Sequence, residues 1–461
     1  MAPLPRRFYL LSDLHVDFRL NLAALDAAAA ASSVTGDLPG ARQTDVVLVA
    51  GDVHHRPDKC LSALAALQRR FVGGVCFVPG NHEAFLPPTA RKDHDARPNV
   101  AGNDSLTQLI SLCRRAEAAG IVVRPAVWRR AAIGGRDVWV VPLWGWHHPS
   151  WDREGVEGAE GGMLADAALC RWPPPPPPPP ASARPSPQPP PVGGGPAAPS
   201  PGHPAALLDR VNIDGLPWTD DGGAPAAGAN GFESVASAAA ALEAIRAARA
   251  LGESPVVLTF SHFLPLQARA WAQRRRRRRR RPQRAADPPC PPPPPTSPLQ
   301  ELLPPAALLR PPGLAKAMGS DAIAARVASL VPHCHGFGHS HVDVRRDVRH
   351  AAPATGARGT ASAATAPDPG PAATRFVQRA LKYPRERGAG GPEASASASP
   401  DPGGLALAVG PARLWPPDDD GGGGGGRCGC WPRPGGARLR PPGWDERVAW
   451  ERGGGWLTTS P

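Results

Sequence analysis

The sequence has few aromatic residues and no long hydrophobic run. Phe, Trp and Tyr together make up 5% of the 461 residues, and only two of them are Tyr. No apolar run approaches the ~20 residues of a membrane-spanning helix, so we expect no membrane segment and no membrane partner. The length would suffice for two or three domains, but so few aromatic residues favour one sizeable domain with other sequence around it.

A disulfide framework is also lacking. The eight cysteines are scattered, without the spacing of a disulfide-rich domain or a zinc ribbon, which favours a reducing compartment. A strand expected from Phe8 leaves no room for a signal peptide. We therefore expect a cytoplasmic protein, with a nuclear location as the alternative because of an arginine run in the sequence.

Proline and glycine are abundant instead. Pro 62 and Gly 51 make up about a quarter of the chain, close to the level of low-complexity sequence. Eight consecutive arginines, Arg274 to Arg281, carry two thirds of the net charge of +12, so the rest of the chain is only mildly basic.

Segments of this composition cannot bury enough apolar surface to fold. We expect disordered inserts at about residues 172–230, 272–298 and 351–373, and a disordered Gly/Pro-rich tail at residues 388–461. Their Pro, Ala, Gly and Arg residues have GC-rich codons. A biased genome, or a gene model that retains introns, explains them better than a dedicated function.

The remaining sequence alternates between strand and helix patterns. Short apolar runs rich in β-branched residues predict strands at residues 8–12, 45–50, 75–78, 121–123, 138–141, 256–260 and 375–378. Apolar residues at helical spacing predict helices at residues 59–71, 105–120, 232–251 and 322–330. This alternation indicates an α/β fold with helices on the faces of a sheet.

Five short polar motifs each follow an apolar stretch. They are Asp13-Leu14-His15, Gly51-Asp52, Gly80-Asn81-His82-Glu83, Ser261-His262 and Gly338-His339-Ser340-His341. Any one alone is usually chance, a turn or a core histidine. Five in order at strand ends, where α/β folds bind ligands, indicate a metal site. Carboxylate, imidazole and amide oxygen without thiolate suit Mn, Fe or Zn and disfavour an all-oxygen Ca site.

The order of these motifs resembles the signature of the calcineurin-like metallophosphoesterase superfamily, whose five blocks are all present. The resemblance covers residues 8–387 once the inserts are removed. It implies a β-sandwich flanked by helices, within the α/β class. One departure is that no acidic residue follows Asp52, where the chain continues Val53-His54-His55-Arg56.

By this resemblance, the chain is a metal-dependent phosphoesterase with two divalent ions, either Mn, Fe or Zn. Asp52 would bridge both ions. The other implied ligands are Asp13, His15 and His341 in the first site, and Asn81, His262 and His339 in the second. His82 would stand beside the leaving group, so Asp52 and His82 are the expected catalytic residues.

Physical chemistry agrees with this assignment. Two cations about 3.5–4 Å apart need a shared carboxylate to offset their repulsion, and together they lower the pKa of a shared water. The resulting metal-bound hydroxide would attack phosphorus in line, while His82 would donate a proton to the leaving oxygen. The sequence leaves open whether the substrate is a phosphomonoester or a phosphodiester.

Two other functions stay open. A catalytically silent scaffold of the same fold would lack ligands, yet all seven are in the sequence. A nuclease or nucleic-acid-binding protein could set Arg274 to Arg281 against phosphates. No interleaved aromatic residues accompany the run, so nucleic acid is a partner that we do not favour.

Several neighbours of the motifs have two interpretations. Trp144 and Trp146 either line a substrate cleft or cover the edge of the core. His147 or His148 could touch phosphate. His54 and His55, which follow Asp52, are candidate hydrogen-bond partners of the ligands.

Overall fold

The structure is a computed structural model. It describes residues 7–23, 45–97, 104–130, 135–148, 165–174, 202–216, 232–265, 317–341, 344–349, 371, 373–378, 380–381 and 412–415. The chain divides into two units, Met1–Pro417 and Asp418–Pro461, and every described residue lies in the first. No helix among the described residues is long and apolar enough to cross a bilayer.

A four-stranded sheet carries the N-terminal strands. Its order is β11 (Ala412–Trp415), β1 (Phe8–Leu11), β2 (Val46–Ala50) and β3 (Gly74–Val78). The last three run parallel, and β11 pairs antiparallel with β1. All residues of β1, β2 and β3 are buried, which explains why these strands read as unbroken apolar runs and do not alternate with polar residues.

A seven-stranded sheet lies opposite. Its order is β6 (Glu233–Ser234), β4 (Ala126–Trp128), β5 (Val138–Pro142), β7 (Val256–Phe260), β8 (Cys334–Phe337), β10 (Ala373–Gln378) and β9 (Val344–Arg349). The strands β5, β7, β8 and β10 are parallel, and the strands at both edges pair antiparallel. The carboxyl ends of β7 and β8 therefore point the same way.

The two sheets pack face to face. Leu10 of β1 fills the space where Gly336 of β8 has no side chain, since a Cβ there would lie 2.7 Å from Leu10 Cδ1. Phe8 meets Trp128 edge to face, with ring centroids 5.6 Å apart. A larger residue at position 336 would push the sheets apart.

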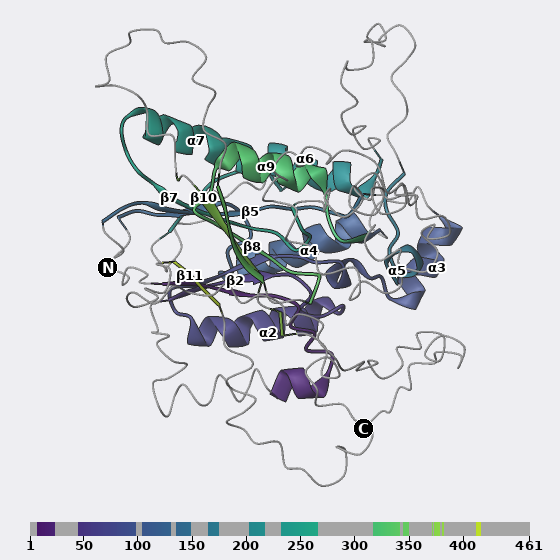
Figure 1. Cartoon of the computed structure of the whole chain (residues 1–461). Coiled ribbons are helices and arrows are strands. Elements are labelled where there is room, and N and C mark those ends of the chain that lie inside the picture. Colours follow the sequence, from purple (N-terminus) through teal and green to yellow (C-terminus); the bar gives the residue numbers. More distant parts are fainter. Residues whose placement is uncertain are drawn as a thin grey trace, which may run out of the picture. The chain divides into compact units, whose positions relative to one another are not determined.

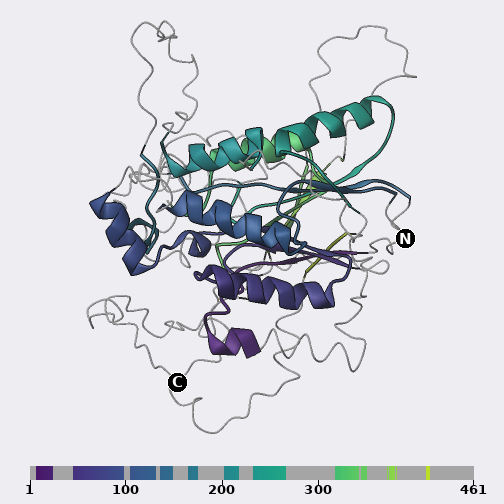
Figure 2. The same ribbon diagram turned by 180° about the vertical axis from the view of Figure 1, so that it is seen from behind.

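Helices cover the outer faces of the sandwich. Figure 1 shows α2 (Pro57–Arg70) on one side of the sheets, and α6 (Pro204–Asp214), α7 (Ala238–Ala250) and α9 (Asp321–Leu330) on the other. Seen from behind in Figure 2, α4 (Ser105–Ala118) lies between the levels of α2 and α7. The predicted α/β fold, a β-sandwich flanked by helices, is confirmed.

Helix boundaries follow local chemistry. The side chain of Asp104 accepts a hydrogen bond from Thr107 N and caps α4, and Ser237 caps α7 in the same way through Ala240 N. Pro57 opens α2, where its missing N–H costs nothing. Two short helices, α3 (Pro88–Ala96) and η1 (His82–Ala84), follow β3.

Some elements differ from the prediction. Residues 233–234 form β6, and helix α7 begins only at Ala238, because Ser237 supplies the cap and the preceding residues pair with β4. The predicted strand at residues 121–123 is reduced to a single bridge between Val122 and Cys76. The strands β4 and β9 were not predicted: β4 has only three residues, and β9 is an edge strand rich in arginine with no apolar run.

Two elements correct the predicted inserts and tail. Helix α6 lies within the insert expected at residues 172–230, and it is ordered because Leu208 and Val211 bury their side chains in the core. Strand β11 lies within the tail expected to be disordered, and it pairs with the edge of β1. The insert at 272–298, including the arginine run, lies outside the described residues, as does nearly all of 351–373.

Candidate metal centre

The polar motifs of the sequence meet at one edge of the sandwich. Asp13 and His15 follow β1, Asp52 follows β2, and Asn81 follows β3. From the other sheet, His262 follows β7, and His339 and His341 follow β8. All seven predicted ligands are brought together, in groups whose His and Asp ligand atoms lie within 4.8 Å of one another.

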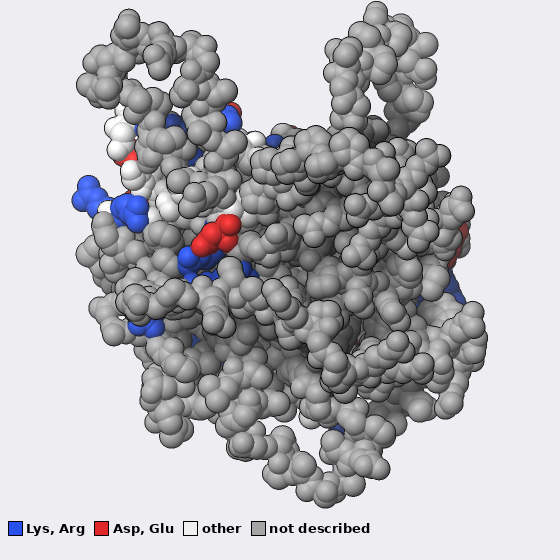
Figure 3. Space-filling model, viewed as in Figure 1, with Lys and Arg blue, Asp and Glu red and all other residues white. Residues whose placement is uncertain are grey.

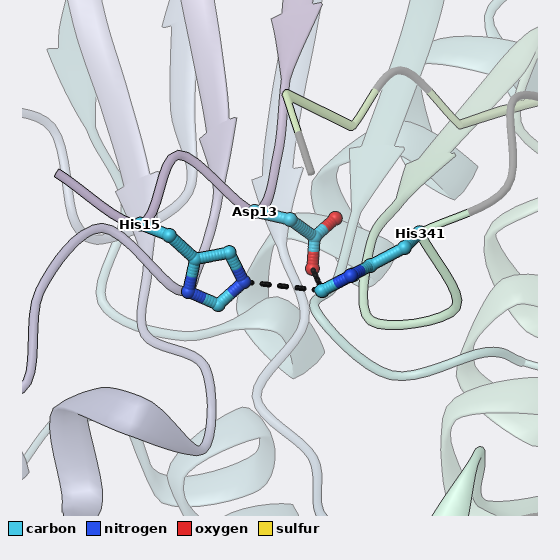
Figure 4. Close-up of side chains that lie close together, drawn as sticks. All are labelled: Asp13, His15 and His341. Carbon is cyan, nitrogen blue, oxygen red and sulfur yellow. Dashed lines mark hydrogen bonds and ion pairs between the residues drawn. The ribbon is translucent and has the colours of Figure 1, made fainter. Parts of the chain in front are cut away.

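The first group consists of Asp13, His15 and His341. Figure 4 shows the three side chains converging, with His15 Nε2 3.1 Å from His341 Nε2 and His341 Nε2 3.6 Å from Asp13 Oδ1. Asp13 also accepts a hydrogen bond from the backbone N–H of His339 at 2.8 Å. This bond ties the loop after β1 to the loop after β8.

The second group consists of Asn81, His262 and His339. His262 Nε2 lies 2.9 Å from Asn81 Oδ1 and 3.1 Å from His339 Nδ1. The other nitrogen of each ring faces a backbone carbonyl, Ala50 O for His262 and Ala317 O for His339, both at 2.9 Å. Those carbonyls can only accept, so the outer nitrogens carry protons, and the inner nitrogens, His262 Nε2 and His339 Nδ1, face each other as the candidate ligand atoms.

Asp52 lies between the two groups and faces both. Its Oδ1 is 3.4 Å from His262 Nε2 in the second group. Its Oδ2 is 4.0 Å from His15 Nε2 in the first. One carboxylate thus presents one oxygen to each group, which is the arrangement of a bridging ligand.

Several of the candidate ligands have a strained backbone conformation. Seven described residues other than glycine have positive φ, and five of them are candidate ligands: Asp13, His15, Asp52, His339 and His341. Such a conformation costs on the order of 1–3 kcal/mol per residue and persists only where the surroundings enforce it. Its concentration here marks the edge of the sandwich as functional.

Two glycines allow the loops after β2 and β3 to touch. Gly51 has φ of +72°, and a Cβ on it would lie 2.6 Å from Gly80 N. A Cβ on Gly80 would in turn collide with Asp52 Oδ1. A side chain at position 51 would therefore displace the backbone of Gly80, and one at position 80 would displace Asp52.

The pKa values of the candidate ligands indicate which of them carry charge when no cation is bound. Burial lowers the pKa of His262, but the Asp52 carboxylate raises it more, to about 9. Burial, with the charge of His262, lowers the pKa of His339 to about 3. Burial alone would raise the pKa of Asp52, yet the histidines around it, His262 first, hold it well below its usual range. A proton on His262 therefore occupies the point where Asn81, His339 and Asp52 converge.

These residues fit a divalent cation. Lone pairs of imidazole, amide and carboxylate groups converge on the same points, and only a positive charge between them satisfies such a set. The buried His/Asp groups therefore fit a metal site.

Comparison with known families agrees with this geometry. Residues 6–151 match the family model described as calcineurin-like phosphoesterase. Over these residues, about a third of its length, the chain is similar to calcineurin-like phosphoesterases. The family consists of hydrolases that act on phosphoester bonds, so the predicted family and enzyme class are confirmed. The matched residues include Asp13, His15, Asp52, Asn81 and His82.

Other comparisons add less. The chain is similar to a solved structure, the phosphopantetheinyl hydrolase PptH from Mycobacterium tuberculosis, at 17% identity and a TM-score of 0.44. The match covers 92% of this chain and 100% of that one. No curated protein matches the chain significantly.

His82 of the phosphoesterase motif stands at the rim of the site. Its Nε2 is 3.9 Å from Asp52 Oδ2, and its ring centroid is 4.7 Å from that of His15. The side chain is 18% exposed, whereas those of His15 and Asp52 are 0% and 3% exposed. His82 can therefore meet a substrate from the solvent side.

Glu83 has a structural role that the sequence did not reveal. Its buried carboxylate accepts hydrogen bonds from four backbone N–H groups: Asp52 at 3.0 Å, Val53 at 2.7 Å, His54 at 3.0 Å and Gly80 at 2.6 Å. Burial and the charge of Asp52 raise the pKa of Glu83, while the N–H groups of Gly80 and His54 act against that rise. One side chain thus joins the loops after β2 and β3.

The residues that flank the sequence motifs have different surroundings in the structure. Trp144 and Trp146 are buried at 4% and 3% exposure and belong to the core, so the interpretation as core cover is supported. The imidazole of His54 accepts a hydrogen bond from Arg56 N in its own loop. Asp166, which no motif indicated, lies against both Asn81 and His147.

Proposed function

We propose that the chain hydrolyses a phosphomonoester or phosphodiester at a dinuclear metal centre. The observation that carries this proposal is the position of Asp52, whose two oxygens face two separate groups of ligand atoms. A site for a single ion would not need a carboxylate whose two oxygens face two different groups of ligand atoms. Mn, Fe or Zn suits this mixture of oxygen and imidazole ligands.

In this proposal each group holds one ion. Asp13, His15 and His341 form the first set, Asn81, His262 and His339 form the second, and Asp52 belongs to both. When bound, the ions supply a nucleophile at neutral pH and offset the charge of the phosphoryl oxygens. The protein's own residues then decide orientation and proton delivery.

His82 is the proposed proton donor. It is the more exposed of the imidazoles around Asp52, and its backbone N–H donates to Asp52 Oδ1 at 3.0 Å, which fixes its position relative to the bridging carboxylate. From the rim its ring can protonate the oxygen of the departing group.

The test is metal dependence. We expect protein loaded with Mn or Zn to contain two equivalents of metal by elemental analysis and to hydrolyse a generic aryl phosphate ester. Chelation should abolish that activity and added metal should restore it. Protein that holds no metal after loading, together with activity indifferent to chelator, would overturn the proposal. A screen of monoesters, diesters, phosphopeptides and nucleic acid on the loaded protein would then give the substrate class.

The face of the molecule seen in Figure 3 gives no support to a nuclease. On the face seen in Figure 3, the described basic and acidic side chains form small separate groups of both signs. The arginine run lies outside the described residues. Nucleic acid therefore stays a less favoured substrate, and the screen above tests it.

A further inference from the structure

A carboxylate outside both sheets contacts one of the candidate ligands. Asp166 lies on the short helix α5 (Ala165–Leu169), and its Oδ1 accepts a hydrogen bond from Asn81 Nδ2 at 2.9 Å. Its Oδ2 lies 3.2 Å from His147 Nε2. The residue is only 8% exposed, so both of its oxygens are committed to these two neighbours within a largely dry environment.

The contact decides which atom Asn81 presents to the site. An amide has a donor end and an acceptor end of nearly the same shape, and only the oxygen can bind a cation. A buried carboxylate can only accept, so the Nδ2 end must face Asp166. The Oδ1 end is then left 2.9 Å from His262 Nε2, within the second ligand group.

We propose that Asp166 is a positioning residue for the second metal site, because it holds the Asn81 amide with its oxygen toward the ion. Its charge also polarises the amide and makes Oδ1 a better ligand. His147 lies against the other oxygen of Asp166 and limits the positions that the carboxylate can take. This inference rests on the proposed dinuclear centre, and it assigns a role in metal binding to helix α5, which lies outside the two sheets.

The first experiment is a graded series at one position, read out as metal content and affinity. Asp166→Ala removes the acceptor and frees the amide to turn. We expect binding at one of the two sites to weaken by about 10–100-fold, the usual effect of losing a group that orients a ligand. Asp166→Asn keeps an acceptor oxygen but loses the charge, so its effect should be intermediate.

The second experiment exchanges donor and acceptor. Asn81→Asp alone would set two carboxylates against each other and should weaken the second site. The double variant Asn81→Asp/Asp166→Asn restores a donor–acceptor pair in the opposite sense and should recover the second equivalent of metal. A residue that matters only for folding would not produce this recovery.

Controls separate the alternatives. Asp209→Asn removes a partly buried carboxylate that pairs with Arg326 on neighbouring helices, and it should leave both equivalents in place. Unchanged affinity at both sites in Asp166→Ala, or a double variant no better than Asn81→Asp, would overturn this inference alone. A wild-type protein that binds no metal would instead overturn the proposed function on which the inference rests.

Discussion

The two sheets contribute chemically different ligands to the candidate centre. The four-stranded sheet supplies every candidate oxygen ligand, Asp13, Asp52 and Asn81, from the ends of β1, β2 and β3. The seven-stranded sheet supplies only imidazoles, His262, His339 and His341, from β7 and β8. The negative charge that attracts a dication therefore lies on one side of the sandwich, and neutral ligands that complete the coordination lie on the other.

The division has a physical use. Carboxylates on both sides would repel one another across the interface of the sheets in the metal-free protein, whereas an imidazole can accept a proton and attract the carboxylate opposite. His262 and Asp52 form such a pair at 3.4 Å. The sandwich can therefore close before the metal arrives.

The largest effect should come from removing charge on the four-stranded side. Asp52→Asn halves the ligand atoms available for bridging and removes the negative charge between the ions, so we expect loss of both metals. The rate should fall by more than the ~10²–10⁴-fold of a lost general acid. His341→Ala, on the other side, should lose only one metal. Elemental analysis beside rate measurements checks both, and two metals retained in Asp52→Asn would contradict the bridging role.

His82 tests whether a residue of the four-stranded side acts without binding metal. His82→Ala should keep both metals and lose on the order of 10²–10⁴-fold in rate for a poor leaving group. The loss should shrink for a nitrophenyl ester, because that oxygen needs little protonation. If the variant loses a metal, or slows both substrates equally, His82 is a ligand or a structural residue.

Glu83 tests the connection between the loops after β2 and β3. Glu83→Ala leaves four buried N–H groups without their acceptor, at about 1–3 kcal/mol each, so we expect the free energy of unfolding to fall by at least ~3 kcal/mol. Glu83→Gln should cost less, since one oxygen remains. The control is Glu233→Ala, which removes an exposed ion pair with Arg129. We expect its free energy of unfolding, measured in urea, to lie within ~1 kcal/mol of the wild-type value.

The fourth prediction concerns pH in the metal-free protein. The pKa of His262 is about 9 in the fold, above its ordinary value of about 6.5, so its protonated form stabilises the fold fully below pH 6.5. That stabilisation, on the order of 3 kcal/mol, should be lost as the pH rises through about 9. Bound metal requires neutral His262 and should abolish the dependence. The free energy of unfolding, measured at pH 6 and pH 9 with either chelator or Mn present, tests this pH dependence. The control is His262→Gln, which should lack it.

The smallest effect should come from the chain between the two ligand-bearing strands of the seven-stranded sheet. The composition of residues 274–295 predicts that they bury no core, and the length of a connection between two elements changes its closure entropy little, so we test their deletion. We expect unchanged folding and unchanged activity on an aryl phosphate. Deleting residues 204–214 should instead destabilise the fold, because α6 buries Leu208 and Val211. Loss of soluble protein on the first deletion would make that segment part of the domain.

Apolar runs followed by polar motifs are local signals, so the sequence predicted the central strands and the motifs at their ends. The seven candidate ligands were assigned by the resemblance of these motifs to a known superfamily. Edge strands such as β6 were missed, since two residues paired with β4 show no pattern of their own. Helix α6 was missed because its flanks are Pro-rich, although Pro204 at its first turn was a usable signal. Asp166 had no signal at all, since its contact with Asn81 spans 85 residues.

The junction of the loops after β1 and β8 has a consequence for biosynthesis. His15 and His341 are 326 residues apart in the chain, and so are the partners in the bond from His339 N to Asp13. At about 5–20 residues per second, the ribosome completes the first ligand roughly 15–65 seconds before the last. The nascent chain can therefore present carboxylates and an amide to solvent long before it can hold a metal with its full ligand set, and loading of the centre must follow the docking of β8.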